Sequence, residues 1–216
     1  ALEFMERDCI EFVMRHVDVK VPLKEGIEAH LFIEVDGNDK DVLFRDCEKI
    51  AAVLSEFDCD DILFAESAQQ KADLWRARRS AGEAVKTHSI YKEEDTVVPR
   101  AELSRLLKGV KEIGKRYGFR SVCYGHAGDG NLHVNIIKEN LSDEDWNTKV
   151  PQGIREIFRL CVELGGTLSG EHGIGYVQKQ YMDIPFSEVQ LALMKGIKRL
   201  FDPNGILNPG KIFPED

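Results

Sequence analysis

The sequence predicts an α+β fold, with helices packed on one face of an antiparallel sheet in a ferredoxin-like arrangement. Segments with apolar residues at helical spacing alternate with short strand-like segments, and the connections between them are short. Residues 121–138 read as a β-hairpin, which makes two neighbouring strands antiparallel. A chain of 216 residues with 43% hydrophobic residues can bury a sizeable core, so we expect one domain, or one domain with a subdomain.

The first part of the chain is predicted to alternate between helix and strand. Residues 1–17 carry apolar side chains at helical spacing and predict a helix, and residues 27–37 read as a strand that ends in a turn. An amphipathic helix is predicted at 39–57, followed by a short strand at 62–66. A further helix at 68–87 precedes a connecting segment that leads to residue 100.

The second part adds the hairpin and three more helices, again indicated by apolar residues at helical spacing. Two Pro- and Gly-containing turns predict a turn-rich C-terminal tail. These elements are helices at 100–117, 151–164 and 186–201, a charged solvent-facing loop at 139–145, and the tail at 202–216.

The charge and cysteine content exclude several classes of protein. There are 29 basic and 38 acidic residues, a net charge of −9, which disfavours nucleic acid or an anionic membrane as the main partner. An anionic substrate would therefore need a local cationic site. Five scattered cysteines without a Cys-x-x-Cys pair predict reduced thiols in a cytoplasmic protein. No apolar run approaches ~18 residues, so we expect no membrane-spanning helix.

Two histidines flank the turn of the predicted hairpin. His126 and His133 are separated by a run of Gly, Asp and Asn that can supply the backbone conformations of a tight turn. Residues that flank such a turn come close together, so both imidazoles are expected to face one spot. Asn135, two residues beyond His133, lies on the same face of its strand.

A second glycine-rich turn, at 165–175, carries Glu171 and His172. Two imidazoles and one carboxylate, from His126, His133 and Glu171, form a plausible three-ligand site for a divalent metal such as Zn, Mn or Fe. The alternative is that these are polar turn residues whose hydrogen bonds are satisfied locally. Both interpretations stay open from the residues alone.

Three ordered motifs resemble the C-terminal domain of FAD-linked 2-hydroxy-acid oxidases. The motifs lie at 125–133, 169–175 and 201–211. The family includes the glycolate oxidase FAD subunit, D-lactate dehydrogenase and D-2-hydroxyglutarate dehydrogenase. The resemblance covers nearly the whole chain, more weakly before about residue 70. It implies that residues 1–216 are the substrate- and metal-binding domain, and that the flavin-binding domain, which holds most of the FAD, is missing.

The resemblance also implies roles for single residues. Arg78, in a Leu-Trp-x-x-Arg pattern, would bind the substrate carboxylate, with surface ion pairing as the alternative. Asn135 would orient the substrate, and His172 would accept the hydroxyl proton. In the tail at 202–216, Asn208 would approach the flavin ring. The alternative is that the tail is only a C-terminal stop and has no role at the flavin.

One departure from the family bears on the substrate. The hydroxyglutarate-using members carry a further substrate lysine, and this sequence has no clean counterpart. Glu93 stands at the nearest match, and Lys92 is one residue out of register. This departure argues against a dicarboxylate substrate.

The resemblance implies oxidation of a D-2-hydroxy acid of the lactate or glycolate class to the 2-oxo acid, by an enzyme whose isolated C-terminal domain is inactive. The expected partners are the flavin-binding domain and the substrate, with an electron-acceptor subunit and a homodimer as open possibilities. A cytoplasmic location is expected, with peripheral membrane contact through electron-transfer partners also open. The alternatives are a metal-dependent hydrolase, which would use the same ligands to activate water, and a non-catalytic interaction or dimerisation module.

Overall fold

The computed structural model describes residues 1–214. Within them, seven α-helices accompany six strands whose hydrogen-bonded order is β2-β1-β4-β5-β3-β6. The strand pairs with a described register are antiparallel, so the α+β prediction is confirmed. The chain forms two compact units, and each is described by itself below. The first contains residues 1–88 and 124–128, and the second contains residues 89–123 and the chain from 129 onward.

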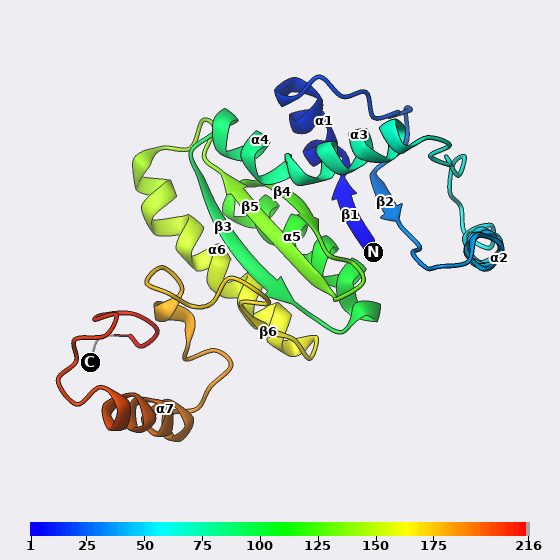
Figure 1. Cartoon of the computed structure of the whole chain (residues 1–216). Helices are drawn as coiled ribbons and strands as arrows, with labels where there is room; N and C mark the ends of the chain where they lie inside the picture. Colours follow the sequence, from blue (N-terminus) through cyan, green and yellow to red (C-terminus); the bar gives the residue numbers. More distant parts are fainter. Residues whose placement is uncertain (215–216) are drawn as a thin grey trace. The chain divides into compact units, whose positions relative to one another are not determined.

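In the first unit, helices α1 (Arg7–His16), α3 (Ala68–Arg79) and α4 (Ala81–His88) accompany strands β1 (Leu2–Glu6) and β2 (Ala29–Ile33) (Figure 1). β1 pairs with β2 on one side and with Tyr124 and Gly125 on the other. α1 packs against α3 and α4 and buries four apolar side chains in the core of this unit, those of Cys9, Ile10, Phe12 and Val13.

The predicted helix at 1–17 is wrong over its first six residues. Leu2–Glu6 is a strand whose last four residues are all buried, so no alternation of apolar and polar residues marked it as a strand. The predicted helix at 68–87 is two helices, because the first ends at Arg79 and the second begins at Ala81. No strand forms at 62–66 within the described residues.

Helix α2 (Lys40–Leu54) forms where the amphipathic pattern predicted it. Asp39 caps it by accepting hydrogen bonds from the backbone N–H groups of Asp41 and Val42. Its predicted core face is not buried, because no residue of α2 is buried among those described. Phe44 and Val53 are exposed apolar residues of this helix.

The second unit contains β3 (Tyr91–Val97), β4 (Arg120–Gly125), β5 (Asn131–Ile137) and β6 (Thr167–Leu168). The last two residues of β4, Tyr124 and Gly125, belong to the first unit. β4 and β5 form the predicted hairpin. β3 was not predicted, yet it pairs with β5 along its whole length. Gly130 closes the hairpin turn with φ +75°, and a Cβ there would lie 1.9 Å from the carbonyl oxygen of Val98, so only glycine fits.

Two long helices, α5 (Leu103–Tyr117) and α6 (Asp143–Glu163), pack against each other and cover one face of β3 and β5 (Figure 1). α6 begins eight residues earlier than predicted. Ser142 caps it by accepting a hydrogen bond from the backbone N–H of Asp145, and three acidic residues in its first turn favour a helix N-terminus.

The last helix, α7 (Glu188–Phe201), buries no residue among those described. Its exposed apolar side chains recur every three or four residues and so form one stripe, made of Val189, Leu193, Ile197 and Leu200. The tail after it turns at Asp202, whose carboxylate accepts hydrogen bonds from the backbone N–H groups of Ile206 and Leu207. The last two residues of the predicted tail at 202–216 lie outside the described residues.

Candidate active site

The face of β3 and β5 that faces away from α5 and α6 is polar. In the strand register, Glu93 lies opposite Asn135 and Asp95 lies opposite His133. Directly opposite residues of an antiparallel pair share a face, and so do alternate residues of one strand. Five polar side chains therefore line one face of two strands, those of Glu93, Asp95, Asn131, His133 and Asn135.

The neighbouring residues of β3 point to the helix-covered face. The ammonium group of Lys92 lies 5.2 Å from the ring centroid of Trp146 in α6. Glu94 is buried and accepts a hydrogen bond of 3.1 Å from the side-chain amide of Gln178. Burial raises the pKa of Glu94 to about 8, against the smaller opposing effect of the Gln178 hydrogen bond. The carboxyl group of Glu94 is therefore mostly protonated at neutral pH.

Asp95 is the centre of the polar face and is completely buried. Its Oδ2 accepts hydrogen bonds from the backbone N–H groups of Glu171 at 2.6 Å and His172 at 2.8 Å. Its Oδ1 accepts one of 2.7 Å from the side-chain amide of Asn131. Burial opposes ionisation, but these donors outweigh it and hold the pKa of Asp95 below its usual range. An ionised Asp95 thus fixes the turn that carries Glu171 and His172.

The turn approaches the strands too closely for a side chain at Gly170. A Cβ at that position would lie 2.4 Å from Nδ2 of Asn131. Ser169 takes a left-handed backbone conformation with φ 56°, and its N–H donates to the backbone carbonyl of Asp95 at 2.8 Å. Gly173, with φ +78°, ends the turn. The glycines of this motif are therefore required by the backbone.

Three of the predicted site residues come together in the second unit. Nε2 of His133 lies 3.8 Å from a carboxylate oxygen of Glu171. The rings of His133 and His172 stack with centroids 5.0 Å apart and an angle of 9° between their planes. His133 is buried, whereas Glu171 and His172 are exposed. Imidazole nitrogens and a carboxylate are suitable ligands for a first-row divalent metal, so these residues fit such an ion.

Glu93 joins this group. Glu93, His133 and His172 each offer one potential ligand atom, and these atoms lie within 4.8 Å of one another. The stacked histidines are thus bordered by two carboxylates, those of Glu93 and Glu171.

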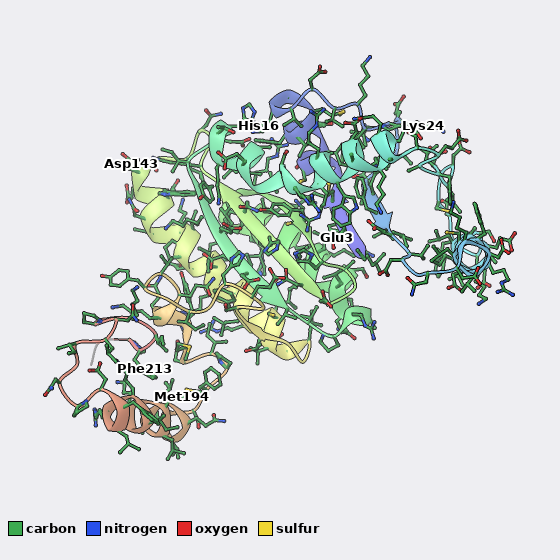
Figure 2. All side chains as sticks on the ribbon, viewed as in Figure 1. Glu3, His16, Lys24, Asp143, Met194 and Phe213 are labelled. Carbon is green, nitrogen blue, oxygen red and sulfur yellow. The ribbon has the colours of Figure 1, made fainter. Side chains whose placement is uncertain are left out.

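Two other predicted residues, Arg78 and His126, meet in the first unit at Glu3 of β1, which is labelled in Figure 2. Both Arg78 Nη2 and His126 Nδ1 lie 2.8 Å from Oε2 of Glu3. The side chains of Arg78 and Glu3 are each only 8% exposed, so this pair is not the surface ion pair considered as an alternative. The guanidinium of Arg78 also lies over the ring of Tyr124, at 5.3 Å from its centroid.

The guanidinium of Arg78 keeps hydrogen-bonding capacity. Its Nε is buried and has no hydrogen-bond acceptor within the described part of the chain. A planar guanidinium can bind both oxygens of a carboxylate, so Arg78 suits an anionic ligand.

The two predicted asparagines lie in different environments. Asn135 is completely buried, and its amide donates to the backbone carbonyl of Val122 at 3.4 Å. Asn208 lies in the tail in a left-handed conformation with φ 47°, and its side chain accepts a hydrogen bond from Lys211. No described interaction joins Asn208 to the polar face of β3 and β5, so its flavin role stays a prediction.

Sequence reasoning missed two site residues, Asp95 and Glu3. Asp95 precedes the β-branched run Thr96-Val97-Val98, which is a strand signal that could have placed it in the sheet. Glu3 offers no comparable signal, because an acidic residue is usually exposed.

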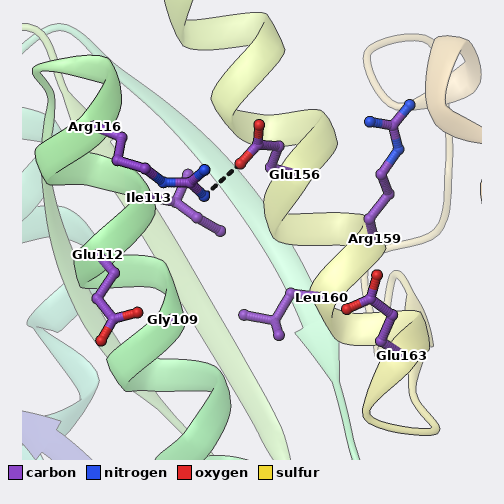
Figure 3. A pocket seen from close by; sticks show the side chains of 8 residues that line it. All are labelled: Gly109, Glu112, Ile113, Arg116, Glu156, Arg159, Leu160 and Glu163. Carbon is purple, nitrogen blue, oxygen red and sulfur yellow. Dashed lines mark hydrogen bonds and ion pairs between the residues drawn. The ribbon is translucent and has the colours of Figure 1, made fainter.

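A groove of about 330 Å³ lies between α5 and α6 (Figure 3). Charged residues line it, and Arg116 pairs with Glu156 across it at 2.5 Å. It has no histidine or cysteine in its lining, and it is formed by the two helices rather than by the polar strand face. We therefore place the candidate active site at the strand face.

Comparisons with known proteins agree with this site. Residues 1–212 match the family described as FAD linked oxidases, C-terminal domain. The glycolate oxidase subunit GlcD of Bacillus subtilis is 36% identical over 100% of this chain and 45% of its own length. A D-lactate dehydrogenase of Anaerostipes hadrus is 34% identical over 98% of this chain and 46% of its own length. A D-2-hydroxyglutarate dehydrogenase of Stutzerimonas stutzeri is 31% identical over 99% of this chain and 46% of its own length.

The chain thus spans about half the length of the curated relatives it matches. Among solved structures, a 4-ethylphenol oxidase from Gulosibacter chungangensis in an isoeugenol complex shares the fold, with a TM-score of 0.59. It is 17% identical, over 100% of this chain and 48% of that one. Within the described residues, no helix is both long and apolar enough to cross a membrane. Because the family match covers residues 1–212, the chain belongs to the FAD linked oxidases, as their C-terminal domain.

Proposed function

We propose that this chain forms the substrate- and metal-binding part of a FAD-dependent dehydrogenase that oxidises a D-2-hydroxy acid of the lactate or glycolate class. The observation that carries the proposal is the group of His133, Glu171 and His172, held in place by the buried carboxylate of Asp95. Family membership and the names of the relatives support the same reaction class.

In this proposal His126, His133 and Glu171 hold a divalent metal, Zn, Mn or Fe. His126 directly follows β4, and His133 lies in β5, so a short hairpin connection links the two imidazoles along the chain. The described contact of His133 with Glu171 supplies the other two ligands. When bound, the metal supplies a Lewis acid that lowers the pKa of the substrate hydroxyl.

The remaining residues bind the substrate and move its proton. Arg78 binds the carboxylate through its guanidinium, for which the free hydrogen-bonding capacity of Nε is the support. Asn135 orients the substrate. His172 accepts the hydroxyl proton, since it is exposed and stacks on His133. FAD supplies the hydride acceptor when a flavin-binding domain is present.

We propose that the flavin-binding domain packs against the apolar stripe of α7 and against the tail at 202–216, so that Asn208 meets the flavin. The exposure of the whole stripe supports this, because a large exposed apolar surface marks an interaction site. An electron-acceptor subunit, a homodimer, a cytoplasmic location and peripheral membrane contact stay predictions.

The test uses the chain joined to a flavin-binding domain, with D-lactate and glycolate as substrates and a dye as electron acceptor. His172→Gln should lower kcat by about 10²- to 10⁴-fold, the usual contribution of a general base. His16→Gln, on α1, is the matched control and should not change kcat. Unchanged turnover in His172→Gln would remove His172 from the reaction.

A second arm separates the alternatives. The chain without a flavin-binding domain should be colourless and should not reduce the dye. Metal-dependent ester or amide hydrolysis by that chain would support a hydrolase instead. If Ala at His133 or Glu171 leaves dye reduction by the joined protein intact, a non-catalytic interaction module would be the better description.

A further inference from the structure

We propose that Glu3 is a positioning residue for the metal site: its carboxylate holds the imidazole proton of His126 on Nδ1, so that Nε2 is the nitrogen that binds the divalent ion. This inference rests on the proposed function, in which His126 is a metal ligand. That function assigns no role to Glu3.

The sheet of the first unit brings the two residues together. β1 pairs with the end of β4, and Phe4 lies opposite Gly125. The next residues along this antiparallel pairing are Glu3 on one strand and His126 on the other. Residues that face each other across an antiparallel pair have neighbouring side chains. The backbone therefore sets the contact between the carboxylate and the imidazole.

The hydrogen bond between these side chains determines which imidazole nitrogen carries the proton. Nδ1 of His126 lies 3.0 Å from Oε1 and 2.8 Å from Oε2 of Glu3. An ionised carboxylate can only accept hydrogen bonds, so Nδ1 must be the donor. In a neutral imidazole the other nitrogen then carries the lone pair that a metal requires. A carboxylate that accepts from one nitrogen in this way orients the ring and makes the other nitrogen a better ligand.

The burial of the two side chains supports a positioning role. The side chain of Glu3 is 8% exposed, whereas that of His126 is 34% exposed and so remains accessible to an ion. A buried carboxylate is costly unless a cation compensates its charge, and Nη2 of Arg78 does so at 2.8 Å. Since a buried ion pair adds little net stability, stability alone is a weak reason for a carboxylate at this position. The orientation of His126 is a better one.

The first experiment reads the tautomer directly and needs no substitution of Glu3. Long-range proton–nitrogen NMR spectra of the nitrogen-15-labelled chain, without metal and at pH 8, show which nitrogen of each imidazole carries the proton. The signal that is missing in His126→Gln belongs to His126. We expect its proton on Nδ1. A proton on Nε2 of His126 overturns the proposal.

The second experiment measures the Kd of the chain for Zn²⁺ by competition with a chelating dye. Glu3→Leu removes the acceptor and should raise the Kd about 10- to 100-fold, as loss of such a partner of a ligand histidine does. Glu3→Gln keeps an acceptor of the same shape, so its Kd should lie closer to that of the wild type. Glu34→Leu is the matched control, because it removes another ion-paired glutamate of the first unit, the partner of Lys71 at 2.7 Å, and it should leave the Kd unchanged.

Equal Zn²⁺ affinity of the wild type and Glu3→Leu overturns the role of Glu3. A purely structural carboxylate would lower the unfolding temperature of Glu3→Leu without changing the affinity of its folded fraction for Zn²⁺. If Glu3→Leu does not fold, the tautomer of the wild type decides. Neither measurement depends on turnover. Both expected results, in a protein that oxidises neither D-lactate nor glycolate when joined to a flavin-binding domain, would overturn the proposed reaction and leave the role of Glu3 standing.

Discussion

Oδ2 of Asp95 accepts a hydrogen bond of 2.8 Å from the backbone N–H of His172, and so ties the second glycine-rich turn to the central strand pair. The same oxygen accepts from the N–H of Glu171 at 2.6 Å. One buried carboxylate therefore sets the position of both a proposed metal ligand and the proposed base. These bonds are to the backbone, so they do not use the side-chain groups that the chemistry needs.

Asp95→Asn should weaken this arrangement. The amide keeps the shape but loses the charge that makes these hydrogen bonds strong, and its NH₂ group cannot accept from both N–H groups. We expect the free energy of unfolding to fall by about 1–3 kcal/mol. Urea denaturation of the chain followed by circular dichroism measures this change. Asp58→Asn, at an exposed position outside the helices and strands, is the control and should be neutral.

A related prediction concerns pH. The pKa of Asp95 is lower in the folded chain than in the unfolded chain, so its contribution to stability is present above the unfolded pKa and is lost as pH falls through the folded pKa. The stability difference between wild type and Asp95→Asn should therefore shrink in strong acid. A difference that is constant from pH 7 to pH 3 would argue against the hydrogen-bonded carboxylate.

Gly170 and Gly196 should respond in opposite ways to alanine. A Cβ at Gly170 would lie 2.4 Å from Nδ2 of Asn131, so the turn or the strand must move. Gly170→Ala should therefore destabilise the chain. A Cβ at Gly196, within α7, meets nothing within 4 Å, and Gly196→Ala should stabilise by about 0.5–1 kcal/mol. Thermal unfolding of both variants tests the pair, and destabilisation by Gly196→Ala would contradict the open surface of α7.

The elements with a regular apolar period were predictable, whereas the strand that carries the site was not. The helices α5 and α7 and the hairpin all show their period in the sequence. β3 reads Tyr-Lys-Glu-Glu-Asp-Thr-Val, with one face that carries the polar side chains of the candidate site and another that buries Glu94. Its charged residues conceal it as a strand, and Asp95 was missed for the same reason.

The site motifs were recognisable where the backbone demands glycine. Gly130 and Gly170 admit no Cβ, so the turns that carry His133 and Glu171 require glycine and can be recognised in the sequence. The pairing of Arg78 with Glu3 has no such local sequence signal, because the partners lie 75 residues apart in sequence and meet only through tertiary packing. Such a contact follows from the fold and not from local spacing.

Glu94 should make stability depend on pH. Its pKa rises from the ordinary 4.5 to about 8 in the folded chain. The folded state then binds one proton more than the unfolded state between these values, so this group's contribution is largest below 4.5 and is lost as pH rises towards 8. This group changes the free energy of unfolding by up to ~1.4 kcal/mol per pH unit, and Glu94→Gln should remove that dependence.

The measurement is the free energy of unfolding of both proteins at intervals from pH 5 to pH 9. The groups near Glu94 are Gln178, which donates to it, the charges of Lys92 and Glu93, and Tyr181, whose pKa Glu94 helps to raise. Lys92→Gln is the control for the nearby charge. Parallel stability curves for wild type and Glu94→Gln would show that Glu94 ionises normally.

Divalent metal should stabilise the folded chain through His133 and Glu171. Zn²⁺ or Mn²⁺ at 100 times its Kd should add about 2.7 kcal/mol, seen as a rise in the unfolding temperature. His133→Gln and Glu171→Gln should each abolish the rise, whereas His30→Gln, on β2, should keep it. Equal stabilisation of wild type and both variants would place the metal elsewhere.

Arg78→Lys should separate the charge of the side chain from its geometry. Lysine retains a positive charge beside Glu3, whereas a neutral replacement would remove one partner of a buried ion pair, a change that costs about 3–5 kcal/mol. It loses the planar fork that binds both oxygens of a carboxylate. In the protein joined to its flavin-binding domain we therefore expect a folded variant with a KM for D-lactate raised about 10-fold or more. Arg79→Lys, the exposed neighbour that lies over Trp75, is the control and should keep the wild-type KM. If Arg78→Lys unfolds at the wild-type temperature and shows the wild-type KM, Arg78 is only the structural partner of Glu3.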